Sequence, residues 1–365
     1  MIKKNILIAT GGTGGHIFPA YSLANYLKEK NYTIKLSSDK RGQRFLKNIK
    51  SFELINIPSS PLIKKNYFKF LFSIITIFFA IIKSFIYLLF NRPSIVFGMG
   101  GYSSFPVCFA AFILKIRFVI YENNLIIGKA NKFLLPFAKK IFVSYKDLEG
   151  IPDKYRNKVI TIGNLVREEI IKNRVASDKK KDEFNNLKIL ILGGSQAAKV
   201  FAELLPPIFE KIKNSEISIE IYQQCQKNQK NQLSEFYKKA KIDHEIFNFT
   251  DNIIEYYFKS NLVITRSGAS VLGELINMNI PFISIPLPSS ADNHQYKNAE
   301  FYFKKGYGYL LEEKDVENKL YDLICNIFKD KLSIKNILSN QRQYSDKNIF
   351  RNLEMNLEKT FDEKN

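Results

Sequence analysis

The chain has 365 residues, of which 45% are hydrophobic and 14% aromatic, a length that exceeds one ordinary hydrophobic core and predicts two domains. Its three cysteines lie far apart and offer no disulfide or metal framework, and we expect a reducing, cytoplasmic setting. The formal net charge of +20 is carried mostly by lysine and comes with no recognisable nucleic-acid-binding module, so the expected anionic partner is a membrane surface or a phosphate, and no nucleic acid.

The N-terminal segment follows a strand–loop–helix pattern. Residues 4–10 form an apolar run, Gly11-Gly-Thr-Gly-Gly15 follows, and residues 19–30 have the apolar periodicity of a helix. Such loops favour phosphate, because glycine admits positive φ and the first amides of the helix attract anions. The spacing matches neither the dinucleotide fingerprint nor the Walker loop. The loop therefore predicts an anion site without identifying its ligand.

Residues 67–90 are the most apolar part of the chain. Two lysines interrupt them and leave only residues 70–82 between, whereas a membrane-spanning helix needs about 20 apolar residues. The less apolar positions recur at helical spacing: Lys69, Ser73, Thr76, Ala80 and Lys83. Three interpretations stay open. The helix is buried in the core, or it lies on the bilayer with its lysines, from Lys64 onward, among the head groups, or it spans the membrane once.

Short apolar runs predict the strands of two similar α/β halves. They lie at 94–97, 117–121, 140–144 and 159–162 in the first half, and at 187–192, 217–222, 245–249, 261–265 and 281–285 in the second. Leu192-Gly-Gly-Ser195 repeats the pattern of Thr10-Gly-Gly-Thr13, and a helix is expected from Ala197 as far as Pro206-Pro207. Strands that alternate with helices imply mostly parallel sheets.

Two further features organise the chain. Residues 173–186 are charged and polar and predict a linker or surface loop, whereas residues 347–361 carry apolar side chains at helical spacing and predict a terminal helix that packs back on the body. Glycine loops occur at 11–15, 98–101, 193–195 and 267–268. Four such loops in a two-half α/β chain indicate phosphate binding more strongly than one alone.

Six segments occur in order between residues 11 and 274: GGTGGHIFPA, GMGGYSSFP, YENN, GNLVR, GGSQAA and RSGASVLGE. Together they resemble the MurG family of peptidoglycan glycosyltransferases. The resemblance implies an α/β chain of the GT-B fold, with two Rossmann-like domains and the active site in the cleft between them. The implied domains are an N-terminal domain at 1–165 that binds the acceptor and the membrane, and a C-terminal domain at 166–345 that binds UDP-GlcNAc. A terminal helix follows at 346–365. It also implies a peripheral enzyme on the cytoplasmic side of the inner membrane, and favours membrane contact for residues 64–90.

The resemblance also implies a set of substrate-binding residues for UDP-GlcNAc. They are Thr13, Gly14, Gly15, Asn124, Arg167, Ser195, Thr250, Ala269, Ser270, Val271, Glu274 and Gln295. Arg167 and Ser195 are implied at the donor diphosphate or sugar, and a backbone group at Thr250 at the uracil. The residue types support one role independently, because an ionised Glu274 only accepts hydrogen bonds and so suits two ribose hydroxyls. Arg266 either uses its fork geometry at the site or forms an internal salt bridge.

The implied reaction is a direct, inverting displacement. The muramyl 4-hydroxyl of the lipid-linked muramyl-pentapeptide attacks the anomeric carbon of GlcNAc, UDP leaves, and a base removes the proton. His16 is the favoured base, because its ordinary pKa of about 6.5 leaves it mostly neutral at pH 7. His16 has two alternative roles: it holds the loop through a hydrogen bond, or it contacts the acceptor diphosphate. Glu122 is the second candidate base. There is no Asp-x-Asp clamp, so we expect no metal and no cofactor.

Two other functions remain open from sequence. One is a UDP-GlcNAc 2-epimerase or another UDP-sugar enzyme of the same fold, and the other is a non-catalytic basic membrane-binding protein. The resemblance further implies, as partners, other cell-wall synthesis and division proteins.

Overall fold

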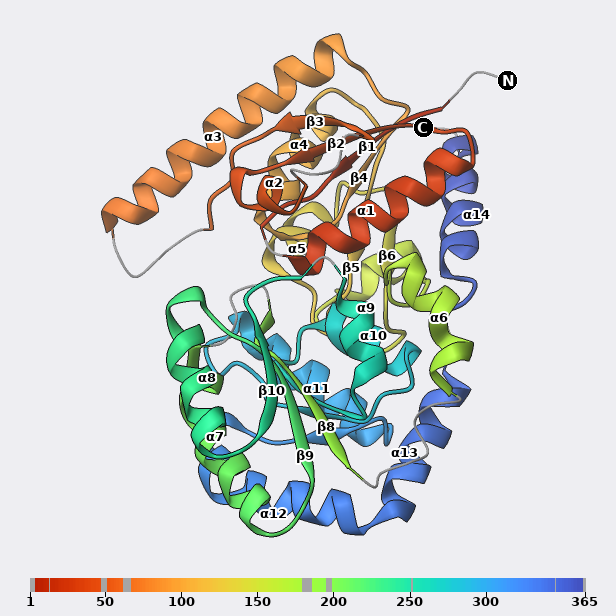
Figure 1. Ribbon diagram of the computed structural model, residues 1–365. Helices are drawn as coiled ribbons and strands as arrows, with labels where there is room; N and C mark the ends of the chain where they lie inside the picture. Colours follow the sequence, from red (N-terminus) through yellow and green to blue (C-terminus); the bar gives the residue numbers. More distant parts are fainter. Residues whose placement is uncertain are drawn as a thin grey trace. The chain divides into compact units, whose positions relative to one another are not determined.

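The computed structural model describes residues 4–12, 14–46, 51–61, 67–178, 186–194, 199–250, 252–344 and 346–363. The chain divides into two compact units, Met1–Val166 with Lys347–Asn365, and Arg167–Asp346. Each unit is a parallel sheet covered by helices (Figure 1), so the predicted α/β class with two Rossmann-like domains is confirmed.

The first unit contains a seven-stranded sheet in the order β3-β2-β1-β4-β5-β6-β7, with every pair parallel. The strands are β1 (Asn5–Ala9), β2 (Thr33–Ser38), β3 (Glu53–Asn56), β4 (Ile95–Gly98), β5 (Phe118–Glu122), β6 (Ile141–Val143) and β7 (Val159–Thr161). The helices are α1 (Gly14–Glu29), α2 (Lys40–Leu46), α3 (Tyr67–Phe90), α4 (Gly101–Ile113), α5 (Lys129–Leu134), the 3-10 turn η1 (Asp153–Lys158) and α14 (Ile349–Asp362).

The terminal helix α14 returns to the first unit, as predicted. Its apolar residues Ile349, Leu353 and Leu357 are buried, and Phe350 stacks on Tyr26 of α1 with ring centroids 5.2 Å apart. The Tyr26 hydroxyl donates to Glu354 at 2.7 Å. Helix α14 therefore belongs to the core of this unit, although the whole of the second unit precedes it in the chain.

The second unit contains a six-stranded parallel sheet in the order β10-β9-β8-β11-β12-β13. The strands are β8 (Leu187–Leu192), β9 (Ile219–Gln224), β10 (Asp243–Phe247), β11 (Leu262–Thr265), β12 (Phe282–Ser284) and β13 (Tyr309–Leu310). The helices are α6 (Glu168–Asp178), α7 (Lys199–Asn214), α8 (Lys230–Lys239), α9 (Ile253–Lys259), α10 (Ala269–Asn277), α11 (His294–Lys304), α12 (Val316–Lys329) and α13 (Lys331–Gln343), with 3-10 turns η3 (Lys227–Gln229), η4 (Ala291–Asn293) and η5 (Glu313–Asp315).

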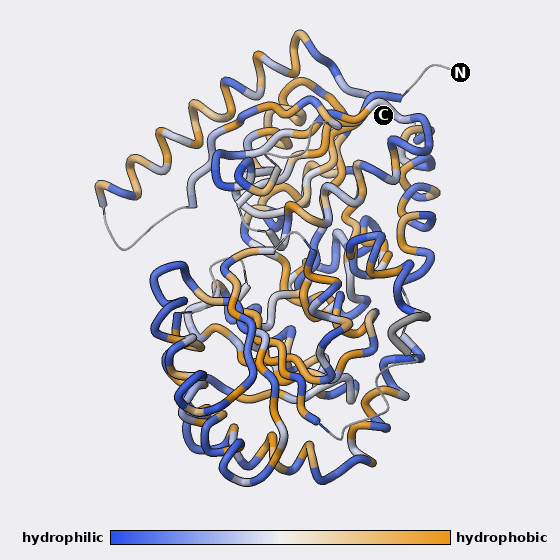
Figure 2. Tube along the Cα trace, viewed as in Figure 1, coloured by the Kyte–Doolittle hydropathy of each residue, from blue (hydrophilic) through white to orange (hydrophobic). Residues whose placement is uncertain are grey.

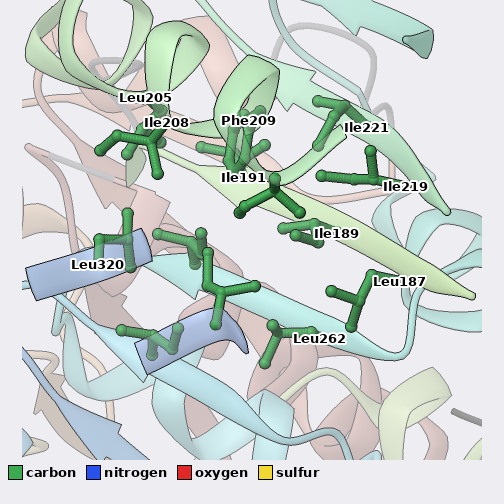
Figure 3. Close-up of a cluster of buried hydrophobic side chains, with 14 of the residues drawn as sticks. Leu187, Ile189, Ile191, Leu205, Ile208, Phe209, Ile219, Ile221, Leu262 and Leu320 are labelled. Atoms are coloured by element: carbon green, nitrogen blue, oxygen red, sulfur yellow. The ribbon is translucent and has the colours of Figure 1, made fainter. Parts of the chain in front are cut away.

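The core of the second unit explains one wrong prediction. Helix α7 was expected to end at Pro206-Pro207, but it continues to Asn214. Each proline removes a backbone donor, a loss of about 3 kcal/mol or more in a helix interior. The side chains beyond them, Ile208 and Phe209, pack with Ile189 and Ile191 of β8 in one buried cluster (Figure 3). Burial of this face outweighs the local cost of the prolines.

The predicted linker at 173–186 is also partly wrong. Residues 173–178 continue helix α6, which begins at Glu168, and residues 179–185 lie outside the described residues. Polar composition alone did not distinguish the end of a helix from a loop.

Helix α3 is the most exposed apolar element of the described chain (Figure 2). Its buried positions are Ser73, Ala80, Ser84 and Leu88, and this face packs against α4. Only 22% of its most apolar window is buried, so the interpretation as a core helix is wrong. The small residues that sequence reasoning grouped with Lys69 and Lys83 face the protein, whereas the large side chains, such as Phe72 (69%) and Phe79 (61%), are exposed.

Candidate active site

The first unit has its topological switch point between β1 and β4, from which the strand order runs in opposite directions. Ligands of open parallel sheets bind outside the carboxyl ends of the strands at such a point. The glycine loops 11–15 and 98–101 leave these two strands and lead into α1 and α4. Gly12 (φ 80°) and Gly100 (φ 82°) adopt conformations that other residues rarely take. Gly14 and Gly15 open α1, and Thr13 lies outside the described residues.

His16 connects the two loops of this switch point. Its Nδ1 lies 3.0 Å from the carbonyl oxygen of Met99, which can only accept, so Nδ1 carries the proton in this hydrogen bond. In the neutral ring the lone pair is then on Nε2. That nitrogen points toward the second loop, 3.3 Å from where a Cβ on Gly101 would be. A larger residue at this glycine would press against the imidazole.

Asp39, directly after β2, supports the first glycine loop, and sequence reasoning missed it. Its buried carboxylate accepts hydrogen bonds from the amides of Gly12 and Gly42, both at 2.9 Å, from the Ser59 hydroxyl at 2.8 Å, and from Arg41 Nε at 2.9 Å. Burial alone would raise the pKa of Asp39, but these hydrogen bonds outweigh it and the pKa is lowered. The ionised carboxylate therefore fixes the backbone of the loop.

The carboxylate of Glu122, at the end of β5, also accepts hydrogen bonds that hold a loop in place. Oε1 accepts from the amide and side chain of Asn124 at 3.1 and 2.9 Å, and Oε2 accepts from the Gly128 amide at 2.9 Å and Asn131 Nδ2 at 3.0 Å. A carboxylate offers about four acceptor positions, so all are used. To take a substrate proton, Glu122 would have to give up one of these bonds, which favours His16 as the base. Asn131 of α5, which is buried and donates to Glu122, was not predicted from sequence as a residue of this site.

The second unit has its switch point between β8 and β11. The loop after β8 begins at Gly193, whose amide donates to Gln224 Oε1 at 3.2 Å; Ser195 lies outside the described residues. The loop after β11 ends at Gly268, the N-cap of α10. The predicted residues Ala269, Ser270 and Val271 form the first turn of this helix, and the positive end of the helix dipole there favours an anion.

Two predicted residues, Arg167 and Glu274, meet within the second unit. Arg167 Nε lies 3.2 Å from Glu274 Oε1, an ion pair without hydrogen-bond alignment. Glu274 Oε2 accepts a hydrogen bond from the hydroxyl of Tyr257 at 2.8 Å. Sequence reasoning missed Tyr257, because nothing in the α9 segment distinguishes it from an ordinary core tyrosine.

Thr250 and Gln295 each support a loop at the same edge of the sheet. Thr250 Oγ1 accepts from the amide of Asn252 at 3.0 Å, next to the start of α9. Gln295 Oε1 accepts from the amide of Leu287 at 3.0 Å, after β12. Both hydrogen bonds are internal to the protein. That Thr250 and Gln295 bind a ligand therefore stays a prediction.

Arg266 forms the internal salt bridge that sequence reasoning left open. Its guanidinium is buried, pairs with Glu313, and donates to the carbonyls of Ile285 at 3.3 Å and Pro286 at 3.2 Å. The fork of the guanidinium thus joins the ends of β11 and β12 to η5. No group of three or more metal-ligating His, Cys, Asp or Glu side chains occurs in the described ranges.

Models of one protein family match both halves of the chain. The glycosyltransferase family 28 N-terminal domain matches residues 6–143 and the C-terminal domain of that family matches residues 188–353. A UDP-N-acetylglucosamine–N-acetylmuramyl-(pentapeptide) pyrophosphoryl-undecaprenol N-acetylglucosamine transferase from Pelagibacter ubique is 35% identical over 359 residues, 98% of each chain. The transferase of that name from Rickettsia felis is 36% identical over 88% of this chain and 91% of its own.

Solved structures show the same fold. The crystal structure of Acinetobacter baumannii MurG matches with a TM-score of 0.74 and 23% identity, covering 96% of this chain and 98% of its own. A UDP-GlcNAc 2-epimerase from Neisseria meningitidis matches with a TM-score of 0.65 and 18% identity, covering 97% of this chain and 100% of its own. At these identities the likeness establishes the fold, and the curated relatives distinguish among enzymes that share it.

Proposed function

Because this chain belongs to the MurG family within glycosyltransferase family 28, we propose that it moves GlcNAc from UDP-GlcNAc to the muramyl 4-hydroxyl of undecaprenyl-pyrophosphoryl-MurNAc-pentapeptide. This is the last cytoplasmic step of peptidoglycan precursor synthesis. The observation that carries the proposal is identity of 35% along nearly the whole length of a relative named for this transfer. The chain is therefore an enzyme, a hexosyltransferase, and not a non-catalytic binding protein.

The donor is assigned to the second unit. The N-terminus of α10 attracts the diphosphate, with Arg167 and Ser195 as further donors, and Glu274 accepts from the ribose hydroxyls. Thr250 and Gln295 complete the contacts that this unit makes with the nucleotide and the sugar, and Asn124 of the first unit stays a predicted sugar contact. Contact between Arg167 and Glu274 supports the assignment, because it places a cation beside a hydrogen-bond acceptor of α10.

The acceptor is assigned to the first unit. Its diphosphate lies against the glycine loop that Asp39 holds, and its 4-hydroxyl approaches His16 Nε2. The hydroxyl oxygen forms the new bond to the anomeric carbon of GlcNAc as the bond from that carbon to the β-phosphate oxygen breaks. The proton passes to Nε2, and the electron pair leaves with UDP. The hydrogen bond from Nδ1 to Met99 supports this role, because it orients the unprotonated nitrogen.

The first unit is also assigned to the cytoplasmic surface of the inner membrane. Among the described helices, α3 alone is long and apolar enough to cross a bilayer, with a window of mean hydropathy 2.2. Its inward face runs from Ser73 to Leu88 against α4, which supports a helix lying along the unit rather than leaving it. Phe112 and Ile113 of α4 and Phe133 of α5 are further exposed apolar residues of this unit. Lys64 and Lys65, predicted at the head groups, lie outside the described residues.

One assay tests the proposed reaction. The purified chain is incubated with UDP-GlcNAc labelled in the sugar and with the lipid-linked muramyl-pentapeptide. Transfer of label to the lipid is the expected result. Release of free ManNAc or UDP-ManNAc would identify the epimerase instead. No turnover under conditions in which a curated relative is active would refute the assignment.

A further inference from the structure

The hydroxyl of Tyr257 contacts a residue of the proposed donor site, Glu274. It donates to Glu274 Oε2 at 2.8 Å, and the residue is only 1% exposed. A buried phenol requires a hydrogen-bond partner, and here the partner is the carboxylate assigned to the ribose. Burial and the Glu274 charge raise the pKa of Tyr257, although Arg167 opposes them. The phenol therefore keeps its proton and donates it in a hydrogen bond to Glu274.

Counting acceptor positions shows what this contact does. The Glu274 side chain is 8% exposed and has about four lone-pair positions. Among the described residues, Tyr257 uses one position on Oε2, and Arg167 lies beside Oε1. One position then remains on each oxygen. Two adjacent hydroxyls, as in the 2′,3′-diol of a ribose, match two acceptors held side by side.

We propose that Tyr257 is a positioning residue that fixes the Glu274 carboxylate so that both of its oxygens accept from the ribose diol of a uridine diphosphate. The inference rests on the proposed function and adds to it a residue that makes the site selective for ribose over deoxyribose. Without the phenol, Glu274 keeps its charge but loses the contact that sets the plane of its carboxylate.

The test uses free nucleotides and the full chain. Calorimetry measures the Kd of UDP and of 2′,3′-dideoxyuridine diphosphate for the wild type and for Tyr257→Phe. The chain supplies a matched control in Tyr256, the neighbouring residue of α9, whose hydroxyl donates to Glu245 of β10 at 2.6 Å. Tyr256→Phe removes a tyrosine–carboxylate hydrogen bond from the same helix but away from Glu274.

We expect Tyr257→Phe to weaken UDP binding about tenfold, in keeping with loss of a hydrogen bond to a charged group. Binding of the dideoxy nucleotide changes less than twofold, so the preference for ribose falls about tenfold. In the transfer assay KM for UDP-GlcNAc rises while kcat is nearly unchanged. Tyr256→Phe leaves both nucleotides unaffected. In a Glu274→Gln background, Tyr257→Phe adds less than twofold.

Equal weakening of both nucleotides, or an unchanged preference, would overturn the inference and leave the proposed function standing. A wild type that binds both nucleotides equally would instead refute the ribose site itself, and the inference with it. Thermal midpoints establish that each variant is folded. A second variant, Tyr257→Met, also lacks the hydroxyl and must show the same selective loss; if it does not, the inference is wrong.

Discussion

The exposed face of α3 leads to a quantitative prediction about membrane binding. Phe72 and Phe79 lie seven residues apart on the same side of the helix, with 69% and 61% of their surface exposed. Such a side chain has about 200 Å² of surface when fully accessible, of which about two thirds is exposed here. Transfer of that exposed part out of water at about 25 cal/mol per Å² is worth about 3 kcal/mol for each ring. A helix lying at the interface immerses about half of this, so the pair contributes about 3 kcal/mol, or about 100-fold in partitioning.

The perturbation is the double variant Phe72→Ser with Phe79→Ser, measured by co-sedimentation with vesicles of phosphatidylglycerol and phosphatidylcholine. The control is Phe303→Ser, because Phe303 of α11 is 52% exposed but belongs to the second unit. We expect the double variant to lose about 100-fold in partitioning and the control to lose less than twofold. Neither substitution touches the buried face of α3.

Two results would refute this reasoning. If the double variant sediments as the wild type does, the exposed face does not enter the bilayer. If Phe303→Ser loses as much, binding is not specific to α3. Resistance of the wild type to an alkaline wash would favour the single span, because a helix held at the interface is released when its electrostatic contacts are lost.

Three further predictions concern catalysis and stability. His16→Ala is expected to lower kcat about 100-fold with KM for UDP-GlcNAc unchanged; a loss below tenfold with weaker binding of the lipid acceptor would exclude the base role. Asp39→Asn is expected to lower the thermal midpoint at pH 7 and to lower it less as the pH falls below about 4, because a lowered pKa gives stability that is present above the unfolded value of about 4 and lost as the pH falls through the folded pKa. A difference in thermal midpoint between wild type and variant that does not narrow at acid pH would exclude this origin. Arg266→Gln is expected to lower the free energy of unfolding by about 3 kcal/mol in urea titrations, since it leaves the partly buried Glu313 without its cation. The control is Arg156→Gln, which removes an exposed ion pair with Asp153 and should lower the free energy of unfolding by less than about 1 kcal/mol. If both variants lose the same free energy of unfolding, burial of the Arg266–Glu313 pair is not the cause of the loss.

Most strands were predicted from short apolar runs in the sequence, and β2, β3 and β13 were missed. The runs at 94–97, 117–121, 187–192 and 261–265 predicted β4, β5, β8 and β11 to within a few residues. Strand β2 (Thr33–Ser38) was missed, because its sequence TIKLSS alternates polar residues with apolar ones and its two serines are buried. Strand β13 has two residues and no pattern of its own. Pairing with neighbouring strands of the sheet, not local hydrophobicity, determines β2 and β13.

The periodicity of α3 was visible in the sequence, but its orientation was not. Hydrophobic patterning assumes that the large apolar side chains face the protein. Here Ser73, Ala80 and Ser84 face it, because small residues let α3 approach α4 closely and their hydroxyls are satisfied within the helix; Ser84 donates to the Ala80 carbonyl at 2.7 Å. The large side chains are consequently left outside. Only the packing partner resolves which side of such a helix is inward.

The three acidic residues at the carboxyl edges of the sheets show why residue type alone could not assign roles at the site. Asp39 and Glu122 each accept from four donors among the described residues, so each is consumed in holding a loop. Glu274 has one hydrogen bond and one unaligned ion pair, and keeps acceptor capacity on both oxygens. Unused lone pairs are therefore the property by which we propose Glu274, rather than Asp39 or Glu122, as the carboxylate that binds ligand. The proposed role of Tyr257 follows from the same property, because its hydroxyl takes one acceptor position of Glu274 and leaves others open.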